Sequence, residues 1–184
     1  SPQAFQEISD KYRLMQQAKA AGVAIPDTLF VPDGRVEEVL REIADFPVVV
    51  KPGCSLVKDG RRWTKTSVCY AESPEELLRL YRERAYLRQP SLIQRRVIGE
   101  GQGLFVLMQE GMPLGMFAHR RLRERPPSGG VSVLRESIAL PKAMVEATLK
   151  LLQPVKWHGV AMVEFKVDTA TQHPLLMEIN GRFW

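Results

Sequence analysis

The sequence predicts an α+β protein of two lobes, in which the C-terminal lobe is mainly antiparallel sheet. Two observations predict this class. Strand and helix patterns alternate over residues 1–93, as in an α/β lobe. Residues 94–184 instead consist mostly of strand patterns that are joined by short polar turns. We therefore expect an N-terminal lobe over residues 1–93 and a C-terminal lobe over residues 94–184.

The N-terminal lobe is predicted to begin with a helix and a short strand. "SDKYRLMQQAKAAG" has apolar residues at helical spacing, with Ser9 in place for an N-cap and Gly22 for the helix end. "TLFV" at residues 28–31 is a short strand pattern. A second helix is expected to begin at Asp33 and to run to Ile43.

A buried strand and a further helix complete this lobe. "FPVVVKP" is apolar up to Lys51, and the proline after that lysine ends the strand. Residues 53–65 lack apolar periodicity and are expected to form a loop before a strand at residues 66–71. Ser73 and Glu76 form a capping-box pattern that predicts the next helix, and "SLIQRRV" predicts the strand after it.

The C-terminal lobe is predicted to consist of strands and one helix. "GLFVLMQEGMPLGMFAHRRL" predicts two strands that are joined by a turn at Glu110 and Gly111. "GGVSVLRESIAL" predicts a third strand, and Pro141 begins a helix. "HGVAMVEFKVD" and "PLLMEINGRF" are expected to pair as antiparallel strands, because the polar loop "TATQH" between them is short.

Composition indicates a soluble globular protein. The 184 residues are 45% hydrophobic and 26% charged, which is ordinary for that class. No apolar run is long enough to cross a bilayer, and the sequence does not open with a signal-peptide pattern. We therefore expect a cytoplasmic protein with no membrane partner. Cys54 and Cys69 have no CxxC or histidine partner spacing and are expected to be reduced.

Positive charge gathers in two stretches of this chain, whose net charge is +5. They are residues 51–65 and residues 119–125. Two interpretations stay open on charge alone: solvated surfaces, or surfaces that collect a polyanion such as nucleic acid or a nucleoside triphosphate. A nucleic-acid interface needs aromatic residues among the basic ones, and only Trp63 and Phe117 come close. We expect no nucleic-acid partner.

The last predicted strand carries polar residues at alternate positions, which places Glu178, Asn180 and Arg182 on one face. Glu164 precedes Glu178 by fourteen residues and comes roughly opposite it in the predicted strand pair. Two facing carboxylates repel each other unless a cation lies between them, and oxygen ligands suit magnesium. We expect Glu164, Glu178 and Asn180 to bind a metal ion. The alternative is that Glu164 faces solvent and only Glu178 is functional.

Lys51 ends an otherwise apolar strand, and two interpretations of it are open. The side chain extends to solvent, as lysines at strand ends commonly do, or it holds a phosphate at the edge of a cleft. The loop at residues 53–65 is rich in hydrogen-bond donors, which favours a segment that closes over phosphates.

Four segments together resemble the ATP-grasp superfamily, near the carbamoyl-phosphate synthase large chain and biotin carboxylase: "MEINGRFW", "FPVVVKP", "DKYRLMQQAKAAGVAIP" and "LIQRRVIGEG". The resemblance covers nearly the whole chain and implies an ATP-grasp fold with a nucleotide cleft between the two lobes. It departs at the loop after Lys51, which is glycine-rich in the family and has only Gly53 and Gly60 here. It also implies further chain before residue 1 and after residue 184, with homodimerisation left open.

The resemblance implies a role for each residue that matches a family motif. The residues implied to contact ATP phosphates are Lys11 and Lys51. Those implied to contact the adenine base and the ribose are Gln94, Arg95, Val97 and Glu100. The implied ligands of Mg²⁺ (or Mn²⁺) are Glu164, Glu178 and Asn180, and the implied catalytic residues are Arg182, which faces the transferred phosphoryl group, and Lys51.

The implied chemistry is ATP- and Mg²⁺-dependent ligation of a small-molecule carboxylate to an amine or other nucleophile through an acyl phosphate. The basic residues expected near the acceptor or the phosphates are Lys58, Arg61, His119 and Arg135. Two alternatives stand beside this one. The first is a non-catalytic or regulatory nucleotide-binding module of a larger synthetase, which binds MgATP without releasing ADP. The second is a basic nucleic-acid-binding domain.

Overall fold

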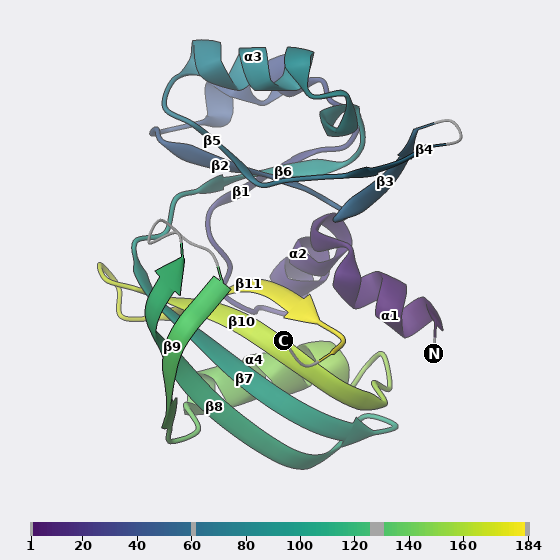
Figure 1. The fold of residues 1–184 in the computed structure, drawn as a ribbon, viewed down its shortest axis with the longest axis vertical. Coiled ribbons are helices and arrows are strands. Elements are labelled where there is room, and N and C mark those ends of the chain that lie inside the picture. The colour runs from purple at the N-terminus through teal and green to yellow at the C-terminus, as the bar shows by residue number, and fades with distance from the viewer. Residues whose placement is uncertain (1, 60–61, 126–130, 183–184) are drawn as a thin grey trace. The chain divides into compact units, whose positions relative to one another are not determined.

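A computed structural model of the chain describes residues 2–59, 62–125 and 131–182 (Figure 1). The helices are α1 (Pro2–Ser9), α2 (Lys11–Ala20), α3 (Pro74–Glu83) and α4 (Lys142–Leu152), with 3₁₀ turns η1 (Val36–Glu38), η2 (Leu40–Glu42) and η3 (Ala85–Arg88). The first six strands are β1 (Thr28–Val31), β2 (Val48–Pro52), β3 (Leu56–Asp59), β4 (Arg62–Lys65), β5 (Cys69–Ala71) and β6 (Ser91–Arg95). The others are β7 (Gly99–Gln109), β8 (Met112–Arg125), β9 (Val131–Ile138), β10 (Gly159–Asp168) and β11 (Pro174–Asn180).

The strands form three sheets, and every strand pair is antiparallel. One sheet has the order β1-β6-β2-β5, a second has the order β11-β10-β7-β8-β9, and β3 pairs with β4 alone. Helices and antiparallel sheets of this kind confirm the predicted α+β class.

The chain divides into two compact units. The C-terminal unit comprises Ser1–Ser9, Gln17–Ile25 and Val97–Trp184, and the N-terminal unit comprises Asp10–Gln16 and Pro26–Arg96. These bounds differ from the predicted division at residues 93 and 94, because β6 continues to Arg95 and because two helical segments near the N-terminus group with the C-terminal unit.

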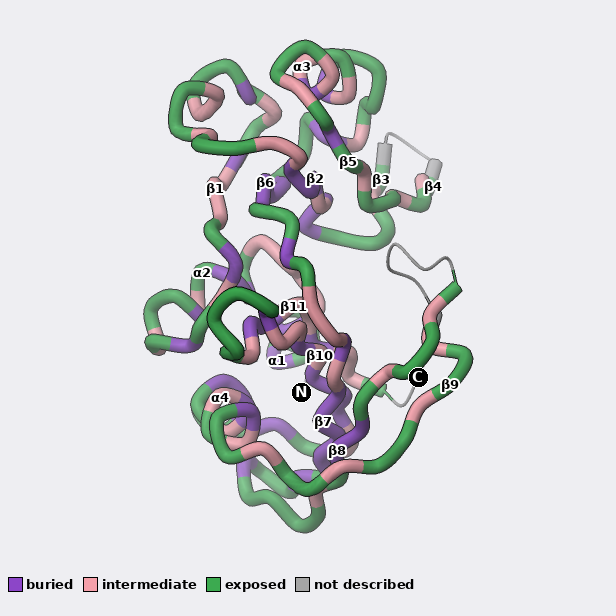
Figure 2. Tube along the Cα trace, turned by 90° about the vertical axis from the view of Figure 1, so that its left-hand side faces the viewer, coloured by how far each residue is buried: buried purple, intermediate pink, exposed green. Residues whose placement is uncertain are grey.

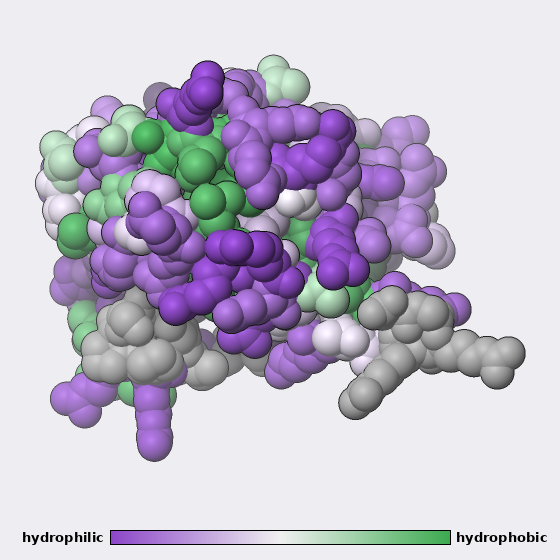
Figure 3. All heavy atoms as spheres, turned by 90° about the horizontal axis from the view of Figure 1, so that it is seen from above, coloured by the Kyte–Doolittle hydropathy of each residue, from purple (hydrophilic) through white to green (hydrophobic). Residues whose placement is uncertain are grey.

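The core of the N-terminal unit lies between its sheet and α3. Val48 and Val50 of β2, Ile93 of β6 and Leu77 of α3 are buried in it. The Ser73 hydroxyl accepts a hydrogen bond from the Glu76 backbone N–H at 3.3 Å, so Ser73 is the N-cap of α3 as predicted. The charged residues of α3 lie on the outer side, and the face seen in Figure 3 is mostly hydrophilic.

Two predicted helices differ from the observed ones. α1 ends at Ser9, so the cap of α2 falls to Asp10, whose Oδ1 accepts hydrogen bonds from the N–H groups of Tyr12 (2.9 Å) and Arg13 (3.2 Å). The predicted helix from Asp33 to Ile43 is wrong, because only the two 3₁₀ turns η1 and η2 form there.

The predicted loop at residues 53–65 is also wrong in part. β3 and β4 pair within it, and Lys58 lies opposite Trp63. Leu56 and Trp63 are both more than half exposed. These two apolar side chains stay exposed, and the sequence of the hairpin has no alternation of apolar and polar residues to predict a strand.

The core of the C-terminal unit lies between its sheet and α4 (Figure 2). Along β7, the alternate residues Leu104, Val106 and Met108 are buried, whereas Leu107 is 45% exposed. Met144 and Leu152 of α4 are buried as well. The turn between β7 and β8 lies at Glu110 and Gly111, as predicted, and both residues have positive φ.

No helix among the residues that the structure describes is long and apolar enough to cross a membrane. Cys54 and Cys69 are both free thiols.

Candidate functional site

An acidic pair lies on the two last strands of the C-terminal unit. Glu164 of β10 and Glu178 of β11 are direct register partners. The Asn180 Nδ2 donates hydrogen bonds to Oε1 of Glu164 (3.2 Å) and to Oε1 of Glu178 (3.0 Å). The three side chains therefore converge on one face of the sheet. The Glu164 side chain is only 16% exposed, so the alternative that it faces solvent is wrong.

A β-bulge produces this convergence. Phe165 pairs with Leu176, but Glu164 pairs with Glu178, so Met177 is an extra residue on β11. Without the extra residue, Glu178 would lie opposite Val163 and would point to the other face of the sheet, because side chains alternate along a strand. The bulge thus turns Glu178 toward Glu164.

A guanidinium group also contacts the acidic pair, and sequence reasoning did not identify it. Arg121 of β8 forms an ion pair with Glu164 through Nη2 and with Glu124 through Nη1, the latter at 3.2 Å. The side chains of Arg121, Glu124 and Glu164 are 15%, 14% and 16% exposed, so this cluster is largely shielded from water. The only signal in the sequence was the "HRRLRER" stretch, which does not say which arginine lies on the site face.

The pKa of Glu164 is raised above its ordinary value. Burial is the main cause, and the neighbouring Glu178 carboxylate adds to it, while Arg121 opposes the shift. Burial and like charge both disfavour the ionised form of Glu164, and a cation bound between the two carboxylates would favour it.

His119 of β8 lies on the same face and is 1% exposed. Neither ring nitrogen has a hydrogen-bond partner among the described residues. Burial, and then the positive charges of Arg121 and Arg135, lower the pKa of His119 to about 4. The imidazole is therefore neutral at pH 7, and it does not supply the positive charge that the sequence suggested for it.

The neutral His119 predicts a pH dependence of stability. Its pKa falls from 6.5 in the unfolded chain to about 4 in the folded one, so the unfolded chain binds more protons between these values. The contribution of His119 to the free energy of unfolding is complete above pH 6.5, and about 3 kcal/mol of it is lost as the pH falls to 4. In His119→Gln, urea unfolding should show a shallower fall in free energy between pH 7 and pH 5. The parent protein and His173→Gln, which removes an exposed histidine, are measured alongside it. A slope in His119→Gln equal to that of the parent protein would contradict the assignment.

A backbone hydrogen bond in the N-terminal unit joins the segments that carry the two predicted phosphate lysines. Lys51 is in β2, and the Lys11 backbone N–H donates to the Gly53 carbonyl at 2.7 Å. The first residue of α2 is thus bonded to the segment that directly follows the lysine strand. Lys58 is exposed on β3, and Arg61 lies outside the described residues.

The predicted adenine and ribose residues have partners inside the protein. Gln94 is 1% exposed and donates from Nε2 to the Thr28 hydroxyl at 2.9 Å. Arg95 pairs with Asp27.

Val97 and Glu100 belong to the C-terminal unit. The Val97 side chain is buried, and its carbonyl accepts from Lys166 Nζ at 3.4 Å. Glu100 accepts from Gln102 at 2.8 Å and pairs with Arg120.

Two further arginines were predicted near the phosphoryl group and the acceptor. The Arg182 Nη2 donates to Asn180 Oδ1 at 3.4 Å, which places the guanidinium next to the acidic pair. The Arg135 Nη2 lies 3.5 Å from the Ser132 carbonyl, and Arg135 is the register partner of Arg121.

No protein-family model matches the sequence, and no curated protein sequence matches it. Solved structures do match. Biotin carboxylase from Campylobacter jejuni has a TM-score of 0.74 at 18% identity, over 100% of this chain and 42% of that one. A RiPP-associated ATP-grasp ligase from Chryseobacterium gregarium, in complex with ADP and a leader and core peptide, has a TM-score of 0.73 at 16% identity, over 100% and 55%. The chain has the ATP-grasp fold.

A D-alanine–D-alanine ligase from Bacillus anthracis, complexed with ATP, shares this fold with a TM-score of 0.62 at 21% identity, over 95% of this chain and 55% of that one. The chain therefore spans about half the length of the ATP-grasp structures that it matches.

The oxygen atoms of the acidic pair fit the divalent metal ion that an ATP-grasp fold implies. Glu164 and Glu178 offer carboxylates from opposite strands, and Mg²⁺ prefers such ligands when phosphate oxygens and waters complete its shell. Asn180 now points its amide nitrogen at the pair and its oxygen at Arg182, so it would offer oxygen after the amide turns over. No group of three acidic, histidine or cysteine side chains suited to a metal occurs within residues 2–59, 62–125 and 131–182.

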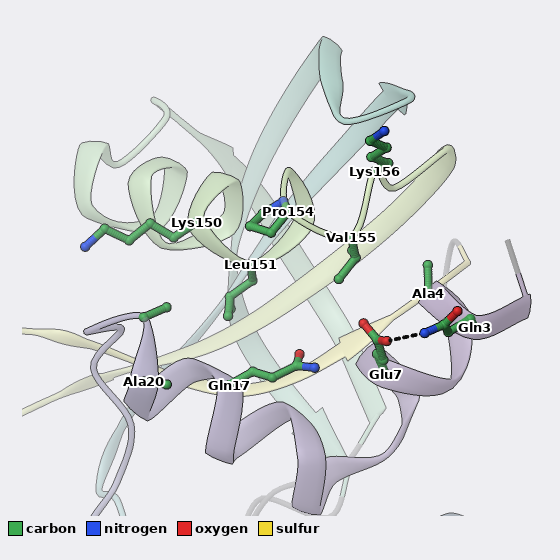
Figure 4. Close-up of a pocket in the computed structure, with 11 residues that line it drawn as sticks. Gln3, Ala4, Glu7, Gln17, Ala20, Lys150, Leu151, Pro154, Val155 and Lys156 are labelled. Atoms are coloured by element: carbon green, nitrogen blue, oxygen red, sulfur yellow. Dashed lines mark hydrogen bonds between the residues drawn. The ribbon is translucent and has the colours of Figure 1, made fainter.

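A groove of about 670 Å³ lies elsewhere on the C-terminal unit (Figure 4). It is lined by α1, the C-terminal half of α2 and the end of α4, and Glu7 there accepts a hydrogen bond from Gln3 at 3.2 Å. None of the predicted site residues lines this groove.

Proposed function

We propose that this protein is an ATP- and divalent-metal-dependent ligase that joins a carboxylate to an amine or a related nucleophile through an acyl phosphate. The observation that carries the proposal is the convergence of Glu164, Glu178 and Asn180 on one face of an ATP-grasp sheet. Two adjacent carboxylates, of which Glu164 is largely buried and Glu178 half-buried, lower the stability of a fold, and a bound cation would offset their repulsion.

In this proposal Glu164, Glu178 and Asn180 hold the metal ion. When bound, Mg²⁺ (or Mn²⁺) would neutralise charge on the phosphates of ATP. Each of the three residues has a side-chain oxygen atom, and the bulge at Met177 places Glu164 and Glu178 opposite each other on one face of the sheet.

The cationic side chains offset the charge of the phosphates as the phosphoryl group moves. Lys11 and Lys51 would contact the phosphates from the N-terminal unit, and Arg182, beside Asn180, would face the transferred group. An oxygen of the carboxylate substrate attacks the γ-phosphorus and ADP leaves. The amine nitrogen then attacks the carbonyl carbon, phosphate leaves, and the nitrogen loses a proton.

Recognition of the nucleoside is proposed to involve the segment from β6 to β7. The Gln94 side chain is bonded to Thr28 inside the sheet, so base contacts there would come from backbone groups of Gln94–Val97. Glu100 is the proposed ribose contact. Lys58, Arg61 and Arg135 remain proposed contacts to the phosphates or to the acceptor.

The direct test is ADP release from the protein with Mg²⁺ and ATP across a panel of carboxylic acids and amines. The panel begins with amino acids, because one structural neighbour is a D-alanine–D-alanine ligase. We expect ADP release that requires one acid and one nucleophile together, and that stops when Mg²⁺ is withheld. MgATP binding without release on any pair would favour the non-catalytic module instead.

A further inference from the structure

The glycines of "GEGQG" leave a gap on the site face of β7. A Cβ on Gly101 would lie 2.9 Å from Cδ of Arg121 and 3.0 Å from Oε1 of Glu124. A Cβ on Gly103 would lie 2.9 Å from Nε2 of His119. β7 separates β8 from β10, so side chains of β8 can lie across it only where β7 has none. We call Gly101 and Gly103 the glycine gap.

Arg121 uses the glycine gap to reach an acidic residue two strands away. It extends from β8 over Gly101 to Glu164 of β10, and it contacts Glu124 of its own strand on the way. Glu124 and Glu164 therefore both pair with one guanidinium, whose side chain is 15% exposed, and Glu178 lies next to Glu164. The acidic pair therefore has a positive partner in the absence of any metal ion.

We propose that Arg121 is the resident counter-ion of the acidic pair and competes with the divalent cation for Glu164. This inference rests on the proposed metal site. Glu164 has one oxygen on Arg121 and the other on Asn180, so both of its oxygens are engaged before a metal ion arrives. A divalent ion that binds Glu164 must either displace the guanidinium of Arg121 or lie close to its positive charge, which repels the ion.

The competition sets the order of binding. Free divalent ions bind weakly, since Arg121 repels them and occupies their ligand. The phosphates of a nucleotide add negative charge, and they offer the displaced guanidinium new acceptors. The site thus takes its metal ion together with the nucleotide and stays paired with Arg121 when no nucleotide is present.

The test measures Mn²⁺ binding without nucleotide, by electron paramagnetic resonance of free Mn²⁺ at pH 8. Arg121→Gln should bind Mn²⁺ about tenfold more tightly than the parent protein, which corresponds to ~1.4 kcal/mol. The matched control is Arg120→Gln, one residue away on β8, whose guanidinium pairs with Glu136 and Glu100. It removes the same charge and should leave Mn²⁺ affinity unchanged.

Glu178→Gln separates failure of this inference from failure of the metal site. If Glu178→Gln weakens Mn²⁺ binding and Arg121→Gln matches Arg120→Gln, the metal site stands and the counter-ion role of Arg121 is overturned. If Arg121→Gln binds Mn²⁺ more weakly than the parent, the role is overturned too. Mn²⁺ binding that Glu178→Gln leaves unchanged would overturn both.

Thermal unfolding gives a second readout, because Arg121→Gln leaves Glu164 and Glu124 without their partner. Saturating Mn²⁺ should raise the melting temperature of Arg121→Gln more than that of Arg120→Gln.

If Arg121→Gln does not fold, Gly101→Ala takes its place, since its Cβ would push Arg121 Cδ away from β7. Tighter Mn²⁺ binding in Gly101→Ala supports the role, and unchanged or weaker binding overturns it.

Discussion

Glu178→Gln is expected to weaken MgATP binding by about 100-fold or more. Metal ligands are usually more costly to replace than the residues behind them, whose loss already costs 10–100-fold in affinity. The amide of glutamine carries no charge, so the ion would keep one carboxylate where it had two. Titration calorimetry with MgATP measures the effect.

The control for this prediction is Glu136→Gln. Glu136 lies on β9 of the same sheet and pairs with Arg120 at a side chain that is 44% exposed. It should bind MgATP like the parent protein, and both variants should keep the circular dichroism of the parent. A Glu178→Gln protein that is folded and binds MgATP with unchanged affinity would contradict the role of the acidic pair.

Gly99→Ala is expected to destabilise the protein by about 3 kcal/mol, at the upper end of what overpacking costs. A Cβ on Gly99 would lie 1.9 Å from the carbonyl oxygen of Val167 and 2.8 Å from its carbonyl carbon. Both are backbone atoms of β10, so a side-chain rotation cannot relieve the contact. β7 and β10 would have to separate where Gly99 pairs with Asp168.

Urea unfolding of Gly99→Ala and Gly115→Ala measures this cost with a matched pair. Gly115 is in β8 of the same sheet, and nothing lies within 4 Å of the Cβ that an alanine would add there. Gly115→Ala should change the free energy of unfolding by less than about 1 kcal/mol. Equal stability of the two variants would mean that β7 and β10 are not held as closely as the structure has them.

The strand pattern at the end of the chain was readable from the sequence. Glu164, Glu178 and Asn180 were predicted on one face, because strand alternation and a short polar loop restrict how two such segments pair. The helix that Ser73 caps and the turn at Glu110 were also predicted, since both depend on local sequence.

The β-bulge that fixes which face of the sheet Glu178 lies on could not be predicted from the sequence. The bulge at Met177 shifts the register by one residue, and no residue of that segment marks it in the sequence. Arg121 was missed for a related reason. Its contact with Glu164 crosses β7, and it depends on Gly101, a residue whose role appears only once the strand order is known.

The charge state of His119 could not be predicted from its neighbours in the sequence either. His119 follows a strand pattern and precedes two arginines, and this composition suggested a positive group. Its burial beside Arg121 and Arg135 makes it neutral instead, because desolvation and like charge both disfavour the protonated form. Charge state depends on neighbours that come together only in the folded sheet.

A crystal structure with Mn²⁺ and a non-hydrolysable ATP analogue would test the central claim most directly. Anomalous scattering locates Mn²⁺ without reference to the protein density. We predict a manganese peak ~2.1 Å from carboxylate oxygens of both Glu164 and Glu178, the distance typical of the Mg²⁺ that it replaces. A manganese ion bound by the phosphates alone, with Glu164 still on Arg121, would contradict the claim.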